Sequence, residues 1–247
     1  MDIASRLESV RERIATAAER AGRRPEAIEL VAVTKTWPAE TVLAAYEAGL
    51  RHFGENRAEE LSGKRTAVET ILGSDSGITW HAIGALQSRK ANLVADSATV
   101  FHALERSKIA RKLSSRLVEN GRLEAEALGV FIEVNLSGEP NKAGIACDQW
   151  EENGLQREKL LELAQLVQNL PGLRPFGLMA MAPWQVEERV IRDVFGRTRR
   201  LSEWLLDQSE AGDWSKLSMG MTDDYELAIL EGATHIRIGR AIFGSRA

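Results

Sequence analysis

Leu30-Val31-Ala32-Val33-Thr34-Lys35 is the stretch on which the interpretation of this sequence depends. A short β-branched apolar run that is soon followed by Pro38 predicts a buried strand. We expect Lys35 to be the last residue of this strand and to keep its amine in a cleft, where burial favours the neutral, nucleophilic form of an amine. On its own, the stretch favours a lysine whose tip reaches solvent. The rest of the chain decides between these two interpretations.

The unit of a short apolar strand followed by a helix recurs along the chain. Strands that alternate with helices indicate parallel pairing through right-handed crossovers, and eight such units in about 250 residues predict a closed (β/α)8 barrel of the TIM type. An open doubly wound α/β sheet is the alternative, but no glycine-rich dinucleotide turn follows the first strand. The predicted strands span residues 30–35, 50–54, 78–84, 99–103, 129–135, 175–181, 216–220 and 235–239.

Two further segments shape the predicted barrel. Residues 3–21 carry apolar side chains at steps of three and four, which predicts an amphipathic helix ahead of the first strand. Because the sequence stops at Ala247, soon after the eighth strand, we expect this extra N-terminal helix to cover the side of the barrel that lacks a full eighth helix. A loop over residues 136–144 is expected to lead into a long helix that Asn153-Gly154 can interrupt. No linker indicates a second domain, so residues 1–247 are expected to form a single domain.

Composition excludes several classes of protein. The formal net charge of -4 argues against a nucleic-acid-binding protein, which would normally carry a basic face. No apolar run approaches the length of a membrane span, and the first residues lack the pattern of a signal peptide, so a cytoplasmic protein is expected. The lone cysteine, Cys147, excludes an internal disulfide, and no pair of histidines or carboxylates has the spacing of a metal site.

Polar residues gather at the predicted carboxyl ends of the strands, where barrels of this kind carry their chemistry. The loops after the seventh and eighth strands, which often bind phosphate in such barrels, begin Ser218-Met219-Gly220 and Gly239-Arg240-Ala241. The glycines either let backbone N–H groups approach an anion or only turn the chain, and the residues alone leave both open. The strand ends carry Lys35, Glu55-Asn56, His81 with Gly84, Asn135, Met179, Ser218-Met219-Gly220 and Arg237 with Gly239.

An amine that faces a phosphate site predicts a phosphorylated aldehyde or ketone held as a Schiff base. A sugar-phosphate intermediate of an aldolase and pyridoxal 5′-phosphate (PLP) both meet this description. Arg237 favours PLP weakly. An always-charged guanidinium that faces a pyridine nitrogen would keep this nitrogen unprotonated, which weakens the electron sink of most PLP enzymes.

As a set, the strand-end motifs resemble those of the pyridoxal phosphate homeostasis family, small proteins similar to the barrel of bacterial alanine racemase. The resemblance runs in order over nearly the whole chain. The motifs are Ala32-Val33-Thr34-Lys35, His52-Phe53-Gly54-Glu55-Asn56, Trp80-His81-Ala82-Ile83-Gly84 with Leu86-Gln87-Ser88, Val134-Asn135-Leu136-Ser137 with Lys142-Ala143-Gly144, Gly177-Leu178-Met179, Leu217-Ser218-Met219-Gly220-Met221-Thr222-Asp223-Asp224, and Ile236-Arg237-Ile238-Gly239 with Ile242-Phe243-Gly244.

The resemblance implies roles for individual residues. It implies that Lys35 carries the cofactor PLP as a Schiff base, that Arg237 faces the pyridine nitrogen, and that Ser218 and the Gly239-Arg240 backbone hold the phosphate. Arg240 departs from the family pattern, which has a small hydroxyl residue there; a backbone contact to phosphate survives this change, and the guanidinium can add a charge contact. The residues implied to line the pocket are Asn56, His81 and Met219.

The resemblance also implies a function: maintenance of intracellular PLP homeostasis by storage, buffering or delivery, with PLP-dependent apoenzymes as partners and a monomer as the expected state. A weak PLP-dependent amino-acid racemase is the alternative. Racemisation needs an acid/base group on each face of the α-carbon. Neither Tyr46 nor Tyr225 is expected over the cofactor, and His81 is disfavoured as a base, so we assign no catalytic residue.

Several remaining residues are given mostly structural interpretations. Lys142, in the loop after the fifth strand, offers a second amine that could take the aldehyde from Lys35 during release, but a solvated loop lysine is the interpretation that we favour. His102 and His235 are expected to be core or wall histidines. The tryptophans expected to pack on helices or near strand starts are Trp150, Trp184, Trp204 and Trp214.

Overall fold

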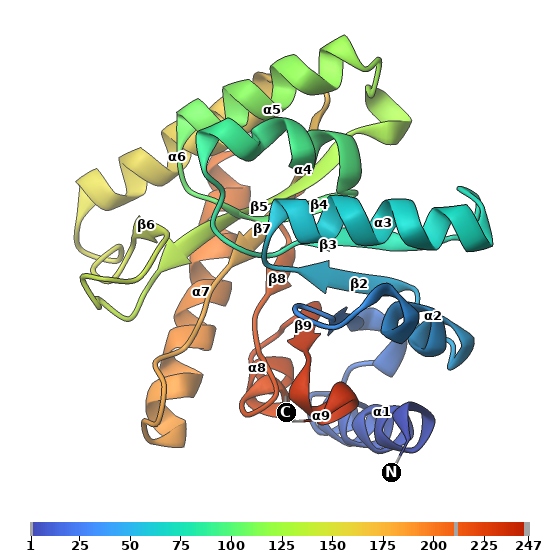
Figure 1. Cartoon of the computed structure of the whole chain (residues 1–247). Helices are drawn as coiled ribbons and strands as arrows, with labels where there is room; N and C mark the ends of the chain where they lie inside the picture. The colour runs from blue at the N-terminus through green and yellow to red at the C-terminus, as the bar shows by residue number, and fades with distance from the viewer. Residues whose placement is uncertain (1, 210–211, 245–247) are drawn as a thin grey trace.

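The computed structural model describes residues 2–209 and 212–244. Eight parallel strands form a ring that the pairing of β4 with β5 closes (Figure 1). This arrangement confirms the predicted α/β barrel. In chain order the barrel strands are β1 (Glu29–Val33), β2 (His52–Glu55), β3 (Thr79–Ala82), β4 (Val100–Leu104), β5 (Leu128–Asn135), β7 (Leu173–Met179), β8 (Lys216–Ser218) and β9 (His235–Ile238).

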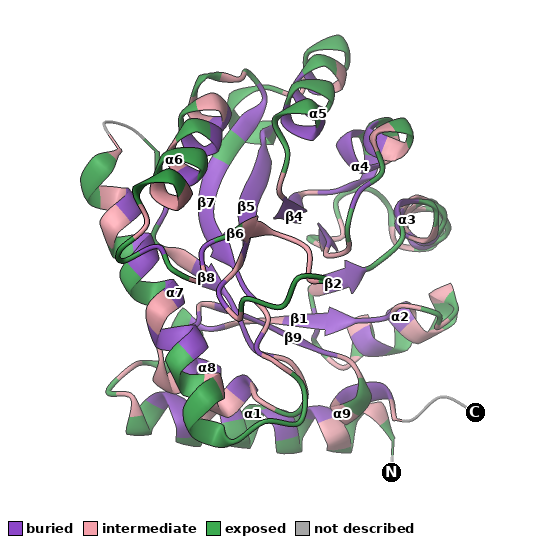
Figure 2. Ribbon diagram, turned by 90° about the vertical axis from the view of Figure 1, so that its left-hand side faces the viewer, coloured by how far each residue is buried: buried purple, intermediate pink, exposed green. Residues whose placement is uncertain are grey.

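Helices surround the ring of strands on its outer side, as Figure 2 shows. The strands are mostly buried, because their outer faces pack against helices and their inner faces meet inside the barrel. The α-helices are α1 (Ile3–Arg20), α2 (Ala39–Glu47), α3 (Ala58–Leu72), α4 (Ala91–Ser97), α5 (Ser107–Glu119), α6 (Gly154–Asn169), α7 (Glu188–Gln208), α8 (Tyr225–Leu230) and α9 (Arg240–Phe243), and single 3-10 turns are η1 (Pro25–Ala27), η2 (Ser88–Lys90) and η3 (Glu124–Glu126).

The N-terminal helix α1 occupies the position predicted for it. Its apolar stripe, which includes Leu7, Val10 and Ile14, is buried, and the helix packs against α8 and the short helix α9 (Figure 1). Asp2 caps the helix by accepting a hydrogen bond from the Ser5 backbone N–H at 2.9 Å. The helix therefore covers the side of the barrel on which α9, the helix that follows the last strand, is only one turn long.

Three local predictions were wrong. The first strand, β1, ends at Val33, so Lys35 lies in the turn after the strand and is not its last residue. The segment after residue 144 forms a two-residue strand, β6 (Ile145–Ala146), which pairs with the end of β5. Asn153 does not interrupt a helix but begins one, because its side chain accepts a hydrogen bond from the Leu155 backbone N–H at 3.1 Å as the cap of α6.

Across the two described ranges, no helix is both long and apolar enough to cross a membrane.

Candidate functional site

A cavity of about 650 Å³ opens at the carboxyl ends of the barrel strands. Most of the loops that follow the strands contribute to its wall, so residues far apart in the sequence meet there. Of the predicted site residues, the cavity brings together Lys35, Asn56, Arg237, Gly239 and Arg240. The full lining consists of Val33, Lys35, Trp37, Asn56, Ile83, Gly84, Ala85, Glu133, Ala143, Met181, Trp184, Met221, Thr222, Asp223, Arg237, Gly239, Arg240 and Gly244.

Lys35 reaches the cavity from a turn that is held on both sides. Thr34, directly before it, is fully buried and donates its hydroxyl hydrogen bond to Glu55 Oε1 at 2.5 Å. Thr36, directly after it, has a φ of 67° and donates its backbone N–H to the Glu60 carboxylate. A non-glycine residue with positive φ persists only where its surroundings fix it. The half-buried Lys35 is therefore presented on a constrained turn.

Lys64, on α3, connects the groups that hold this turn. Its ammonium donates hydrogen bonds to the Thr34 carbonyl at 2.6 Å, to Glu55 Oε1 at 2.7 Å and to Glu60 Oε1 at 2.8 Å. Burial raises the pKa of Glu55, while the hydrogen bonds from Lys64 and Thr34 act in the opposite direction. We call Lys64, Glu55 and Glu60 the ion cluster. Lys64 was not among the predicted site residues, although a lysine between Leu61 and Val68 on the buried face of an amphipathic helix was the signal that could have identified it.

Arg237, on β9, presents a buried charge to the cavity. Its side chain is anchored on the barrel wall, where Nη1 donates to the Ser218 carbonyl at 2.8 Å and to Ser218 Oγ at 2.5 Å. Burial lowers the pKa of Arg237 to about 10, and the charges of Asp224 and Glu133 oppose this effect. The guanidinium thus keeps its positive charge at neutral pH, in an orientation that the wall fixes.

Three predicted site residues do not border the cavity. His81, Ser218 and Met219 are almost completely buried in the layer of side chains beneath it. Ser218 contacts the site indirectly, because its hydroxyl bonds to Arg237 on one side and to His102 Nδ1, at 2.8 Å, on the other. Their proposed contacts with a cofactor stay predictions.

Glu133, on β5, lines the cavity but was not among the predicted site residues. Only 3% of the residue is exposed. Burial raises the pKa of Glu133 to about 7, with a further contribution from Glu105, while Arg237 acts to lower it. The signal in the sequence was an acidic residue inside the otherwise apolar run Val130–Val134. A carboxyl group with this pKa can take up or release a proton near neutral pH.

The rim near the last strand combines a glycine with exposed side chains. Gly239 borders the cavity, and a Cβ atom there would lie 3.1 Å from the Val33 carbonyl oxygen. Arg240 is exposed and pairs with Asp223, and its guanidinium lies 5.8 Å from the ring centroid of Trp184. The prediction that Trp184 packs was wrong, since 63% of it is exposed beside the cavity. It follows Pro183 in the loop between β7 and α7.

The other predicted packing residues behave as expected. Trp150 and Trp214 are buried, and Trp204 is half-buried with its ring centroid 6.3 Å from that of Trp150. His102 and His235 are buried in the barrel interior, as predicted.

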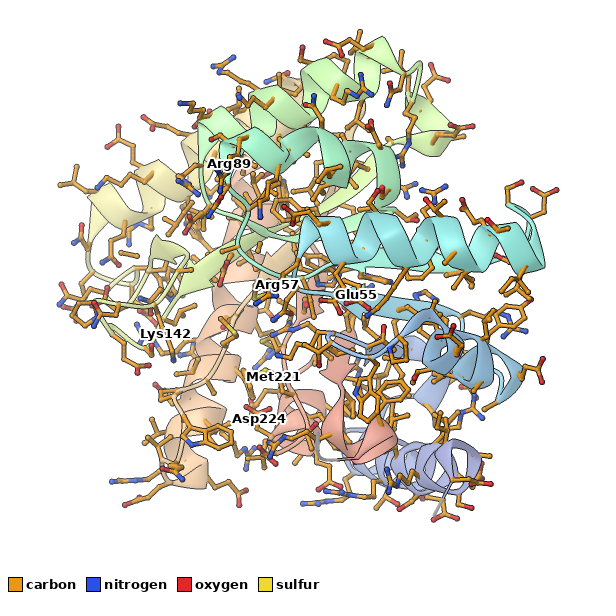
Figure 3. The ribbon with its side chains drawn as sticks, in the orientation of Figure 1. Glu55, Arg57, Arg89, Lys142, Met221 and Asp224 are labelled. Carbon is orange, nitrogen blue, oxygen red and sulfur yellow. The ribbon has the colours of Figure 1, made fainter. Side chains whose placement is uncertain are left out.

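Lys142 lies beside the cavity lining but is not part of it. Its ammonium pairs with Glu139 and donates to Ser137 Oγ at 3.2 Å and to the Met181 carbonyl at 3.4 Å. Figure 3 shows Lys142 near the β6 segment, apart from Met221 and Asp224, which lie in the segment between β8 and α8. Only 21% of its side chain is exposed, so the interpretation as a solvated loop lysine was wrong.

Neither tyrosine lies at the cavity. Tyr46 donates its hydroxyl hydrogen bond to the Ser76 carbonyl at 3.2 Å, and Tyr225 is buried at the start of α8. Within residues 2–209 and 212–244, no group of three or more His, Cys, Asp or Glu side chains could hold a metal ion.

Comparisons with known proteins identify the family of this chain. The family described as alanine racemase, N-terminal domain, matches residues 5–247. The pyridoxal phosphate homeostasis protein of Pseudomonas aeruginosa PAO1 is 41% identical over 244 residues, which are 99% of this chain and 96% of that protein. The protein of the same name in Escherichia coli K12 is 40% identical over 247 residues, with coverage of 99% and 97%.

Solved structures show the same architecture. The structure of PipY from Synechococcus elongatus PCC7942 with PLP bound matches with a TM-score of 0.80 and 30% identity, covering 98% of this chain and 100% of that chain. An alanine racemase from Clostridium difficile 630 matches with a TM-score of 0.68 but only 10% identity, covering 99% of this chain and 57% of that chain, so the likeness concerns the fold alone.

Proposed function

We propose that this chain binds PLP as a Schiff base on Lys35. The chain belongs to the pyridoxal phosphate homeostasis proteins, within the alanine racemase N-terminal domain family. Its task is PLP homeostasis through storage, buffering or delivery, with little or no catalysis. The observation that carries this proposal is one cavity of about 650 Å³ that is lined by both Lys35 and the buried guanidinium of Arg237.

The donors around the cavity fit three functional groups of PLP, which are its aldehyde, its ring nitrogen and its phosphate. An amine condenses with an aldehyde by forming a C=N bond and releasing water, and Lys35 supplies the amine. The guanidinium of Arg237 suits the ring nitrogen as a hydrogen-bond donor. The N–H groups of Arg240 and Ala241 begin helix α9, where the first N–H groups lack a partner within the helix, and they suit a phosphate.

Arg237 also supports the absence of efficient turnover. Bound PLP supplies an electron sink, which is strongest when its ring nitrogen is protonated. Because the guanidinium keeps its proton at neutral pH, it donates to this nitrogen and does not protonate it. The Lys35 turn and Arg237 then hold the cofactor without promoting reactions at an attached amino acid.

The second candidate function is weak amino-acid racemisation, and Glu133 is the observation that favours it. Lys35 supplies one acid/base group, and a carboxyl group with a pKa of about 7 in the same cavity is suited to be the second. The test is exchange of the α-hydrogen of L-amino acids in deuterated water by the PLP-loaded protein. Exchange that Glu133→Gln abolishes would replace the carrier proposal with the racemase.

A titration with PLP tests the carrier proposal. The wild-type protein should develop the visible absorption band of a Schiff base, and Lys35→Ala should lose the band while it keeps its fold. Lys108→Ala removes an amine from the exposed face of α5 and should leave the band unchanged. A protein without a band refutes the PLP proposal, and a band retained by Lys35→Ala moves the anchor to another lysine.

Delivery to PLP-dependent apoenzymes is the finer part of the proposal, and Lys142 bears on it. Lys142 lies beside Ala143 and Met181, which both line the cavity. This position supports a role for Lys142 as a second amine that accepts the aldehyde during release. Lys142→Ala should then keep the absorption band but slow the transfer of PLP to an apoenzyme. An unchanged transfer rate rules out this role. The cytoplasmic localisation and the monomeric state of the protein stay predictions from the sequence.

A further inference from the structure

All four histidines of the chain lie on barrel strands. His52 is on β2, His81 on β3 and His102 on β4, so three of them stand on consecutive neighbouring strands. Their ring nitrogens meet in series: His52 Nδ1 lies 3.1 Å from His81 Nε2, and His81 Nδ1 lies 2.8 Å from His102 Nε2. The three imidazole rings thus form a continuous hydrogen-bonded row inside the barrel.

Each end of this row continues to a charged residue. At the amino ends of the strands, His52 Nε2 lies 3.0 Å from Glu29 Oε2, in a half-exposed pair. At the other end, His102 Nδ1 lies 2.8 Å from Ser218 Oγ across the barrel interior, and Arg237 Nη1 donates to the same oxygen. We call the series Glu29, His52, His81, His102, Ser218 and Arg237 the histidine chain. It joins the floor of the barrel to the cavity.

The two ends give the histidine chain one direction. Arg237 can only donate to Ser218 Oγ, and the Glu29 carboxylate can only accept from His52. The hydrogen bond from His52 lowers the pKa of Glu29, which keeps this carboxylate ionised. Burial holds the pKa values of His81 and His102 well below their usual range, so each of these rings carries one proton.

One arrangement of protons then satisfies every link. Ser218 donates to His102 Nδ1, and each ring donates from Nε2 to Nδ1 of the next, until His52 donates to Glu29. In the opposite arrangement, Ser218 Oγ would receive protons from both Arg237 and His102, and its own hydroxyl proton would lose the His102 acceptor. An unpaired buried hydroxyl is unfavourable.

We propose that the histidine chain is a positioning device for Arg237, in which Glu29 and the three histidines fix the hydroxyl orientation of Ser218 and, through it, the guanidinium at the cavity. Glu29, His52, His81 and His102 are therefore positioning residues. The part of this inference that concerns the cofactor rests on the proposed function, since Arg237 is assigned there to the ring nitrogen.

Other charged and titratable groups face the histidine chain. His235, on β9, packs with its ring centroid 6.4 Å from that of His81 and 6.1 Å from that of His102, but its Nδ1 bonds to Thr234 Oγ1 at 2.9 Å. A second cavity of about 430 Å³, which we call the floor cavity, lies at the amino ends of the strands and is lined by Glu29 and His52. Its lining also includes Glu26, Arg174 and Lys216. Because His235 is not part of the histidine chain, its tautomer should not change with the tautomers of the other three rings. His235 therefore serves as an internal reference in the NMR experiment below.

Long-range proton–nitrogen NMR correlation on cofactor-free protein with 15N-labelled histidines tests the predicted direction. With only four imidazoles, each ring can be assigned from single-histidine variants. His52, His81 and His102 should all carry their proton on Nε2 at neutral pH. A proton on Nδ1 of His81 or of His102, or a doubly protonated ring at either position, would overturn the proposal.

Glu29→Lys tests whether the links are coupled. A lysine offers only donors, so His52 must accept at Nε2 and move its proton to Nδ1, which forces His81 and His102 to do the same. Glu26→Lys makes the same charge change in the same floor cavity and should leave all tautomers unchanged. If Glu29→Lys changes His52 but leaves His102 protonated on Nε2, the coupling does not exist.

The affinity of the variants for PLP is measured separately from the tautomers. Glu29→Lys should weaken PLP binding on the order of tenfold relative to Glu26→Lys, because Ser218 no longer fixes Arg237. Equal affinities in the two variants, alongside switched tautomers, would refute the positioning role. Failure of the wild-type protein to bind PLP would refute the proposed function and leave the NMR result for the cofactor-free protein intact.

Discussion

The ammonium of Lys64 lies 2.7 Å from the Glu55 carboxylate in the barrel wall, and only 8% and 0% of the two side chains are exposed. The same ammonium binds the Thr34 carbonyl, one residue before Lys35. A buried ion pair contributes little net stability when both partners are present, but its disruption leaves a buried charge. The ion cluster therefore couples the position of the Lys35 turn to the stability of the fold.

Lys64→Met should lower the free energy of unfolding by about 3–5 kcal/mol at neutral pH, because it leaves Glu55 buried without its cation. Burial already raises the pKa of Glu55, and loss of Lys64 removes an opposing effect. The destabilisation should therefore be smaller at pH 5 than at pH 8, because protonating the buried Glu55 of the folded variant costs less free energy as pH approaches the ordinary pKa of 4.5. Urea unfolding at pH 5 and pH 8 measures both effects. Lys108→Met, on an exposed helix face, is the control, and equal losses in both variants would contradict the role of the ion cluster.

Glu133 makes stability depend on pH in a defined direction. Its pKa of about 7 in the folded protein exceeds the ordinary value of 4.5, so the unfolded chain ionises this group first as pH rises. Wild-type stability should fall by about 3 kcal/mol from this group as pH rises from below 4.5 to above 7. Glu133→Gln should flatten this dependence, measured by urea unfolding across the range. Glu162→Gln, on an exposed position of α6, should keep the wild-type slope, and a steep slope in Glu133→Gln would assign it to other groups.

Gly84 allows close packing in the cavity wall, where it lies against the Asn56 backbone. A Cβ atom there would lie 2.3 Å from the Asn56 carbonyl oxygen, so Gly84→Ala must displace the loop after β2. We expect a destabilisation of about 1–3 kcal/mol and weaker PLP binding. Gly63→Ala meets no atom within 4 Å inside α3 and should stabilise the protein by about 0.5–1 kcal/mol. Thermal unfolding distinguishes the two, and similar shifts would argue against the steric effect.

The single thiol should be inert in the folded protein. Cys147 is completely buried, and burial raises its pKa to about 12, so almost no thiolate is present at pH 8. Alkylation should proceed only after addition of denaturant. Fast labelling of the native protein would show that the segment after β6 opens readily.

The sequence was sufficient for the barrel because the alternation of apolar strands and amphipathic helices is a local pattern that persists along the chain. It was also sufficient to place Lys35 and Arg237 at one cavity, since the ends of parallel strands meet at the same rim. The end of β1 was misplaced because Thr34, although buried, leaves the strand to bond with Glu55. Ile145–Ala146 is too short for any periodicity to reveal.

Relationships between strands were the hardest to foresee. The link between His102 and Ser218 joins residues 116 positions apart and exists only once the barrel is closed. His81 was expected at the pocket, but the strand register directs it into the layer below. Trp184 was expected to pack because a large apolar ring is usually covered, and its exposure depends on where the loop after β7 runs.

The position of β9 in the chain has a consequence for biosynthesis. This strand pairs with β1 on one side and β8 on the other, so the ring closes only when the last barrel strand to leave the ribosome docks between them. It also carries Arg237 and leads directly into Gly239. Closure of the barrel and completion of the cavity are therefore one event, and a nascent chain without β9 lacks the guanidinium that faces the cavity. During synthesis, we therefore expect the site to hold PLP only weakly until β9 has docked.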